Sequence, residues 1–359
     1  MLSIGIVGLP NVGKSTLFKA LTKKEVEIAN YPFATIDPNV GVVMVPDERL
    51  DKLAEISKSQ EIIPTAIEFV DIAGLVEGAN KGEGLGNQFL HNIREVDAIL
   101  YVTRAFEGSD IQHVSESIDA ERDLEIVKNE LALKDLETVE RRIDKVSKEA
   151  RSGDKESQQE LEILQKFYQI LDSGKHIIEN LITTGLPGGS TGGESETERM
   201  LLGELQLLTA KPAIYLFNVR GQTRNVFGGS IPNITMNVRE ELDSADLIHK
   251  ERKELGLGES KLTQLIQKAY EALNLITFLT TGEKETRAWT IKAGTKAPEA
   301  AGVIHTDFER GFIRAEVIEW DKLVKIGSWS SAREKGLIRT EGKEYIMQDG
   351  DTVLILYKI

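Results

Sequence analysis

The sequence contains no cysteine among its 359 residues. Disulfides, thiolate metal sites and cysteine nucleophiles are therefore excluded, and a chain without thiols fits a reducing cytoplasm. No apolar run approaches the roughly 20 residues that a membrane helix needs, so we expect no membrane partner. Met1 leads into the first apolar run with no charged region or cleavage site before it, and we expect a cytoplasmic protein.

The chain also has fewer basic than acidic residues. The chain has 44 lysines and arginines against 58 acidic residues, a formal charge of −14. Such a balance argues against nonspecific nucleic-acid binding over the whole surface, and we predict no DNA partner. Residues 277–359 hold 13 basic and 13 acidic residues, so the whole excess of −14 falls on residues 1–276. A local basic patch remains compatible with this composition.

The length predicts two or three domains, because one core rarely serves so long a chain. Apolar runs of strand length alternate with helical patterns, which indicates a mostly parallel α/β sheet covered on both faces. These runs lie at 2–7, 40–45, 66–70, 98–102, 212–217 and 231–236. We therefore assign residues 1–122 and 197–276 to one α/β domain.

A charged helical segment interrupts that domain. From residue 123 to about 173 apolar side chains recur three or four apart, which predicts two antiparallel helices that share one apolar seam, with a turn at 152–154. Residues 184–194 are rich in glycine and read as a linker, so the insertion covers 123–196. The stretch 141–151 has a net charge of +3, from five basic and two acidic residues. It is either a solvated helix face or a contact to RNA phosphate.

The composition changes again near residue 275. All three tryptophans lie beyond that point, and short strand-like runs at 288–292, 311–317 and 352–357 alternate with turns. We predict a separate small mixed domain over residues 277–359.

Residues 8–15, Gly-Leu-Pro-Asn-Val-Gly-Lys-Ser, form the most informative motif. They follow an apolar run and lead into a helical pattern, which is the setting of a phosphate-binding loop. Gly8 and Gly13 let the backbone wrap around an anion, and Lys14 would reach the β- and γ-phosphates. The Ser15 hydroxyl would ligate Mg²⁺, and the helix dipole would add its positive end.

A second element must complete the Mg²⁺ shell and respond to the γ-phosphate. Asp71 ends an apolar run, where its carboxylate can bind a Mg²⁺-bound water, and Gly74 can turn its N–H toward the γ-phosphate. Thr35 lies between the first helix and the next strand, where its hydroxyl can join the Mg²⁺ shell when γ-phosphate is present. These positions predict a nucleotide-dependent switch.

Four long motifs resemble one family. The loop at 8–15, Asn-Tyr-Pro-Phe-Ala-Thr at 30, Asp-Ile-Ala-Gly-Leu-Val-Glu-Gly-Ala-Asn-Lys-Gly-Glu-Gly-Leu-Gly at 71 and Arg-Ala-Trp-Thr-Ile-Lys-Ala-Gly-Thr-Lys-Ala-Pro at 287 are similar to the YchF group of Obg-related P-loop NTPases, also called Obg-like ATPases. The stretch at 305, His-Thr-Asp-Phe-Glu-Arg-Gly-Phe-Ile-Arg-Ala, adds to the resemblance. It covers nearly the whole chain in order.

The resemblance implies a nucleotide-binding domain, a helical coiled-coil insertion and a C-terminal TGS domain of ubiquitin-like β-grasp fold. It implies ribosome or ribosomal RNA association, and ATP preferred to GTP. Carried onto this sequence, the nucleotide-binding residues are Asn11, Val12, Gly13, Lys14, Ser15, Thr16, Asn218, Val219, Thr235 and Met236.

Base selectivity can be weighed on the residues themselves. Guanine recognition needs an acid that accepts from its N1–H and N2–H₂, normally supplied by Asn-Lys-X-Asp, whereas this chain has Asn218-Val219-Arg220-Gly221. Unpaired guanine donors would cost about 1–3 kcal/mol each if buried, so strict GTP selectivity is not expected. The resembling family usually has Glu at the Gly221 position and a small-residue pair at Thr235 and Met236, so this chain departs from its relatives there.

The catalytic side also departs from Ras-like enzymes. Leu75 stands where those enzymes place the Gln that orients the attacking water, and Leu cannot do this. Lys14 and Gly74 remain as catalytic candidates, and His113, after a strand-like run and a polar loop, is another. Asn11 is the residue type that holds K⁺ beside the phosphates in related enzymes, so K⁺ joins Mg²⁺ as a candidate cofactor.

The sequence thus favours a slow, Mg²⁺-dependent ATPase that tolerates GTP and switches its affinity for a translation-related partner. Two alternatives stay open. One is a ribosome- or RNA-binding adaptor in which the nucleotide is mainly a structural ligand, and the other is a GTP-selective GTPase.

Overall fold

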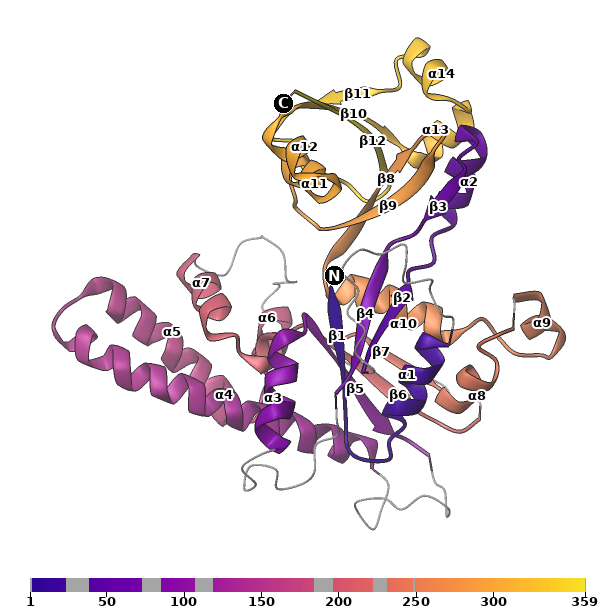
Figure 1. Cartoon of the computed structure of the whole chain (residues 1–359). Coiled ribbons are helices and arrows are strands. Elements are labelled where there is room, and N and C mark those ends of the chain that lie inside the picture. Colours follow the sequence, from indigo (N-terminus) through magenta and orange to yellow (C-terminus); the bar gives the residue numbers. More distant parts are fainter. Residues whose placement is uncertain are drawn as a thin grey trace. The chain divides into compact units, whose positions relative to one another are not determined.

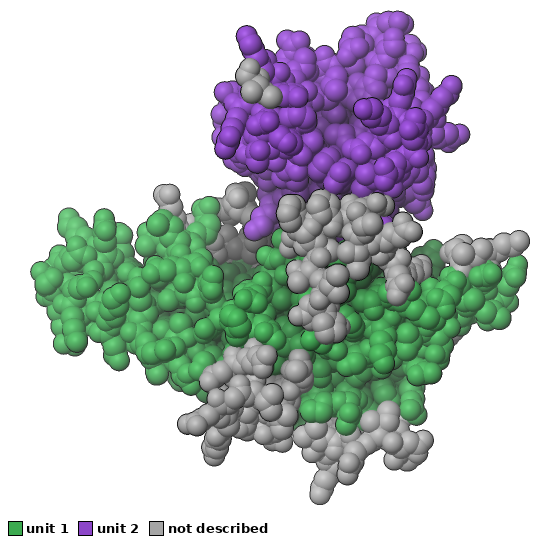
Figure 2. Space-filling model, in the orientation of Figure 1, with its two compact units in different colours: residues 1–43, 67–272 green, residues 44–66, 273–359 purple. Residues whose placement is uncertain are grey.

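The computed structural model describes residues 2–23, 39–72, 85–106, 119–183, 196–221, 231–247 and 249–358. The chain divides into two compact units, residues 1–43 with 67–272 and residues 44–66 with 273–359 (Figure 2). Both units are discontinuous in sequence. In the described part of the chain no helix combines the length and the apolarity required to cross a membrane.

The first unit is built on a six-stranded sheet of order β2-β4-β1-β5-β6-β7 (Figure 1). Its strands are β1 (Ser3–Val7), β2 (Val40–Met44), β4 (Ala66–Asp71), β5 (Ala98–Arg104), β6 (Ala213–Asn218) and β7 (Asn233–Met236). The pairings of β1 with β4 and β5, of β5 with β6 and of β6 with β7 are all parallel. The predicted mostly parallel α/β sheet is confirmed, and β1 and β5 are buried along their whole length.

Helices of this unit flank the sheet and extend from it. They are α1 (Lys14–Thr22), α3 (Leu85–Glu95), α8 (Val238–Asp243), α9 (His249–Glu254) and α10 (Lys261–Ala272). The buried pair Arg252–Glu241 joins α9 to α8, and Glu241 also accepts hydrogen bonds from the Lys261 amide and the Ser260 hydroxyl at the start of α10. This network links the three helices α8, α9 and α10.

The helical insertion forms the predicted antiparallel hairpin of α4 (Ala120–Arg151) and α5 (Lys155–Asp172) (Figure 1). Asp119 and Asp154 cap the two helices by accepting from backbone amides of their first turns. The turn lies at 152–154 as expected, with Gly153 at φ +94°. Buried side chains along the seam include Val139, Val146, Leu164, Phe167 and Leu171. Further helices α6 (Ile177–Thr183), α7 (Glu196–Leu205) and the 3₁₀ turn η3 (Leu208–Ala210) pack against the hairpin.

The second unit is a six-stranded sheet of order β11-β10-β12-β8-β9-β3. Its strands are β3 (Glu61–Ile63), β8 (Leu275–Thr281), β9 (Glu285–Lys292), β10 (Phe312–Glu319), β11 (Arg339–Glu341) and β12 (Asp351–Tyr357). Antiparallel pairs β8–β9 and β10–β12 meet through the parallel pair β12–β8. This mixed sheet with helices agrees with the predicted α+β C-terminal fold.

Two apolar cores lie on opposite faces of this sheet, because neighbouring residues such as Phe278 and Leu279 belong to different cores. One core includes residues of α11 (Ala297–Ile304), and Phe308 of α12 (Thr306–Arg310) packs against it. The other includes α2 (Glu48–Ser57), α13 (Trp320–Ile326) and α14 (Trp329–Glu334).

The division differs from the sequence prediction over residues 44–66, which we expected within the nucleotide-binding domain. β3 pairs in parallel with β9, from Glu61 opposite Glu285 to Ile63 opposite Arg287. Leu50 and Leu53 of α2 are buried in a core with Leu279 and Ile318. These contacts attach the segment to the second unit. The signal is weak in sequence because β3 has only three residues, two of them exposed, and its partner strand lies far along the chain.

Candidate nucleotide site

The phosphate-loop motif connects β1 to α1. A Cβ atom added at Gly8 would lie 2.3 Å from the Val102 carbonyl oxygen, so the loop must pass close to β5. Asn11 and Gly13 have φ angles of +62° and +108°, in the left-handed region. A Cβ at Gly13 would also lie 2.5 Å from Asn218 Nδ2. The two glycines of the motif are therefore required by the local geometry.

Lys14 is held over this loop. Its Nζ donates to the Gly8 carbonyl at 2.9 Å and to the Leu9 carbonyl at 2.8 Å, and the residue is 8% exposed. Burial lowers the pKa of Lys14, and the negative charge of Asp71 acts in the opposite direction. An ammonium group that already lies at the loop, and whose hydrogen-bond partners among the described residues are neutral carbonyls, can exchange them for phosphate oxygens.

Asp71 ends β4, where the sequence placed it. Its backbone amide donates to the Asn39 carbonyl at 2.8 Å, which fixes the strand end, and its carboxylate acts on Lys14. Ser15, at the start of α1, is exposed and lines the cavity described below. A hydroxyl and a carboxylate are hard oxygen donors of the kind that Mg²⁺ uses together with phosphates and water. These two residues therefore fit the predicted metal, and the described residues contain no group of three acidic or histidine side chains that could hold an ion alone.

A cavity of about 570 Å³ opens beside the loop. Seven predicted nucleotide-binding residues lie together in its lining, namely Asn11, Gly13, Lys14, Ser15, Thr16, Asn218 and Val219. Val12 is buried, and its carbonyl accepts a hydrogen bond from Asn218 Nδ2 at 2.9 Å. A site of this volume can enclose a nucleotide.

Asn218 braces the site. Its Oδ1 accepts from the Val238 amide at 3.2 Å, while its Nδ2 holds the phosphate loop through Val12. The side chain is 6% exposed. Both ends of its amide are thus engaged, so Asn218 joins the loop to the start of α8 in addition to lining the cavity.

The base end of the cavity differs in detail from the prediction. Thr235 and Met236 are buried in β7, 7% and 2% exposed, and are not among the described residues that line the cavity. The next three residues, Asn237, Val238 and Arg239, line it instead. The roles of Thr235 and Met236 in nucleotide binding stay predictions.

Sequence reasoning missed Phe106, Arg220 and Arg239 as lining residues. The Cζ atoms of Arg104 and Arg220 lie 4.6 and 4.9 Å from the centroid of the Phe106 ring, so two guanidinium groups stack on one aromatic side chain. The position of Phe106, two residues after β5, was the available signal. No acidic side chain lines the described cavity, in keeping with Gly221, which is exposed with φ +77°.

Four predicted residues lie outside the described residues. They are Thr35, Gly74, Leu75 and His113. Their assigned roles in Mg²⁺ binding, γ-phosphate sensing and water positioning stay predictions.

The comparisons with known proteins cover the whole chain. The sequence profile of a family described as "50S ribosome-binding GTPase" matches residues 3–141, and that of the YchF GTPase C-terminal family, described as a protein of unknown function, matches residues 275–358. The "Ribosome-binding ATPase YchF" of Bacillus subtilis is 47% identical over 376 residues, and the alignment covers 100% of both chains. Its counterpart in Escherichia coli O157:H7 is also 47% identical, with 99% of both chains covered.

A solved structure agrees at the level of the fold. The YchF GTPase of Schizosaccharomyces pombe superposes with a TM-score of 0.83 at 40% sequence identity, covering 99% of this chain and 97% of the other. Near-complete coverage by relatives of almost half-identical sequence and this shared whole-chain fold together make the chain a member of the YchF family.

Proposed function

We propose that this chain is a Mg²⁺-dependent P-loop nucleoside triphosphatase that accepts ATP alongside GTP and associates with the ribosome as a slow nucleotide switch. The arrangement of Lys14 over the phosphate loop is the observation that carries the proposal. The relatives named as ribosome-binding ATPases support both the activity and the partner. A ribosomal partner in turn supports a cytoplasmic location.

The reaction is direct attack by water on the γ-phosphorus. The bond from the γ-phosphorus to the bridging oxygen breaks, the nucleoside diphosphate leaves, and inorganic phosphate is released. Lys14 exchanges its carbonyl partners for β- and γ-phosphate oxygens and stabilises the developing negative charge. Ser15 and Asp71 would hold Mg²⁺, the latter through water, and the bound ion would neutralise phosphate charge.

The water-positioning group is not supplied by Leu75, so we assign it to another side chain, to the partner or to a monovalent cation. His113 is the side-chain candidate and K⁺ the cation candidate. Asn11 supports the second possibility, because it lines the cavity from a left-handed backbone position at the loop.

The base end supports tolerance of both purines. The described lining offers no carboxylate to accept from guanine N1–H and N2–H₂. Asn218 is engaged with Val12 and Val238. Adenine loses nothing by the missing acid, so we propose that ATP binds at least as tightly as GTP.

Turnover measurements test the proposal against the adaptor alternative. ATP and GTP hydrolysis would be followed with and without ribosomes, in K⁺ and in Na⁺, for the wild type and Lys14→Ala. We expect slow intrinsic turnover that ribosomes or K⁺ increase and that Lys14→Ala abolishes. Tight nucleotide binding with no turnover in any of these conditions would favour an adaptor, and a strong preference for GTP in competition binding would favour a GTP-selective enzyme.

A further inference from the structure

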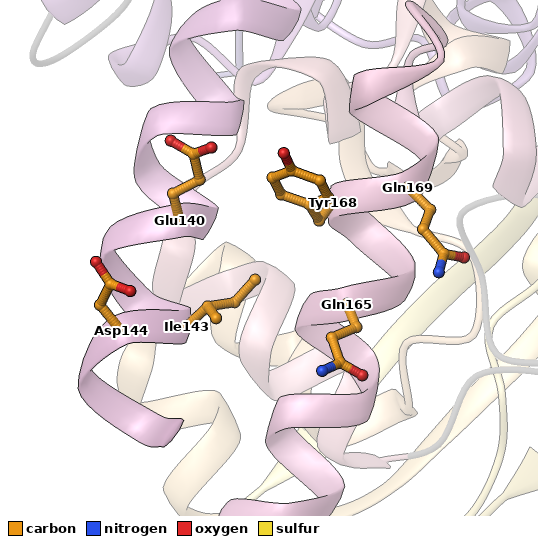
Figure 3. A pocket seen from close by; sticks show the side chains of 6 residues that line it. All are labelled: Glu140, Ile143, Asp144, Gln165, Tyr168 and Gln169. Carbon is orange, nitrogen blue, oxygen red and sulfur yellow. The ribbon is translucent and has the colours of Figure 1, made fainter. Parts of the chain in front are cut away.

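A second hollow lies on the helical hairpin, apart from the nucleotide site. It has a volume of about 490 Å³ and is lined by six residues of α4 and α5 (Figure 3). Ile143 and Tyr168, both half-buried against the hairpin core, form its apolar floor. Glu140 and Asp144 stand along the α4 side, and Gln165 and Gln169 along the α5 side. We call this hollow the hairpin groove.

The polar groups of the groove have no partners within the described part of the chain. The side chains of Glu140, Asp144, Gln165 and Tyr168 make no hydrogen bond or ion pair there, and all but Tyr168 are exposed. Glu140 and Asp144 lie on successive turns of one helix, and like charges at this spacing repel each other by a few tenths of a kcal/mol. A ligand that brings positive charge would relieve this repulsion.

The other edge of the hairpin is closed. Arg142 forms ion pairs with Glu160 of α5 and, at 3.1 Å, with Glu204 of α7. Apolar residues of α7, including Leu201, pack into the hairpin core on that side. No described helix covers the groove edge in this way. Leu133, two turns before Glu140 on the same face of α4, is 51% exposed.

We propose that the hairpin groove binds an arginine-bearing extended segment of a basic protein. A guanidinium group can pair with the carboxylates of Glu140 and Asp144 and stack on the Tyr168 ring. The amides of Gln165 and Gln169 can donate to and accept from a peptide backbone. RNA is disfavoured at this edge, because phosphate would meet two carboxylates. This protein-binding site is additional to the nucleotide switch proposed above.

The proposal also divides the hairpin by function. Arg142, which we considered as a candidate RNA contact, is engaged with two glutamates. Lys145 is exposed and has no described ion pair, so it remains available for phosphate contact. It lies about 100° round α4 from Asp144, on a different side of the helix from the groove.

A binding measurement on the full-length protein tests the groove. The probe is a fluorescein-labelled peptide of alternating arginine and leucine, followed by fluorescence anisotropy at fixed salt. The test variant, Glu140→Gln with Asp144→Asn, keeps side-chain shape and removes two charges. The matched control, Glu149→Gln with Glu156→Gln, also removes two exposed carboxylates without described partners. Glu149 lies half a turn round α4 from Glu140.

We expect the groove variant to lose at least tenfold in peptide affinity, or about 1.4 kcal/mol, and the control to lose less than twofold. Tyr168→Leu, which keeps apolar volume and removes the ring, should also weaken the peptide, and its melting curve checks that it is folded. If both double variants lost the same peptide affinity, the effect would come from the net charge of the chain and not from the groove, and the proposal would be overturned. Absence of wild-type binding, or a labelled RNA oligonucleotide that binds and is weakened by the groove variant, would overturn it as well.

Discussion

At the scale of single residues, the phosphate loop depends on a few positions where geometry permits one side chain only. Lys14 combines burial, two carbonyl partners and a lowered pKa, so its ammonium group is held where the phosphates are expected. The loop amides remain when this side chain is removed. The loss in nucleotide affinity on removing this side chain therefore measures the contribution of the ammonium group alone.

Lys14→Ala should reduce nucleoside triphosphate affinity at least tenfold, or about 1.4 kcal/mol, because the ammonium group at the loop is lost. Isothermal titration calorimetry in Mg²⁺ measures this directly. Lys19→Ala is the matched control, since Lys19 is exposed on the same helix and the charge change is equal. Unchanged affinity in the Lys14 variant would mean that the phosphates bind elsewhere.

Two glycines give opposite expectations when replaced by alanine. Gly8→Ala brings its Cβ within 2.3 Å of the Val102 carbonyl oxygen, so we expect a loss of about 1–3 kcal/mol in stability together with weaker nucleotide binding. Gly203 lies in α7 with no atom within 4 Å of its added Cβ, so Gly203→Ala should stabilise by about 0.5–1 kcal/mol. Urea unfolding of the two variants measures both changes. An unchanged free energy of unfolding for Gly8→Ala would show that the loop can move away from β5 at no cost.

At the scale of elements, the hairpin is anchored to its surroundings by a buried carboxylate. Asp135 of α4 accepts from the amides of Leu208 and Thr209 and from the Thr209 hydroxyl, and it is 1% exposed. Burial raises the pKa of Asp135 to about 6, although these hydrogen bonds act in the opposite direction. The folded state therefore takes up a proton here at a pH where the unfolded chain does not.

This pKa gives a pH dependence of known sign. Because the folded pKa lies above the unfolded one, the contribution of Asp135 to stability is fully present below the unfolded pKa near 4 and is lost as the pH rises through 6. On going from pH 7 to pH 5 the wild type should gain about 1 kcal/mol relative to Asp135→Asn. Urea unfolding of both proteins at each pH measures the difference, in which other titrating groups largely cancel. Parallel stability curves would mean that Asp135 titrates normally.

Helices, strands and loops differ in how far their sequence alone predicts them. The phosphate loop and the hairpin were predicted because their signals are local, a compact motif at 8–15 and an apolar repeat along α4 and α5. Phe106 and Arg220 were not, because the stacking of a guanidinium on a ring leaves no mark in residue spacing. Asn237, Val238 and Arg239 were not predicted either, because no local motif marks the residues that follow β7 as lining a cavity.

At the scale of the whole molecule, the main difference from the sequence prediction is the second unit, which draws α2 and β3 from between two strands of the first. Leu53 of α2 is 0% exposed in a core shared with Leu279, Ile318 and Leu323. The second unit also contains Trp289, Trp320 and Trp329, all the tryptophans of the chain. Tryptophan fluorescence therefore reports on this unit alone.

Leu53→Ala should lower the free energy of unfolding measured by tryptophan fluorescence by about 2–5 kcal/mol, the usual effect of a cavity in a core. The mutated residue lies more than 200 positions before the tryptophans, so such a shift would demonstrate that residues 44–66 fold with 273–359. Leu255→Ala, at a residue 66% exposed in the first unit, is the control and should leave the transition in place. A fluorescence transition that Leu53→Ala does not shift would contradict the two-segment unit.

The parallel pairing of β3 with β9 also sets an order of events during synthesis. A ribosome makes α2 and β3 long before β8, β9, β10 and β12, so the apolar face of α2 that includes Leu50 and Leu53 has no sheet to cover it until the last quarter of the chain emerges. Pairings between segments so distant in sequence form slowly, because a long loop must close first. We therefore expect the nascent chain to carry this uncovered apolar face through most of its own translation, a condition in which chaperones can protect it from aggregation.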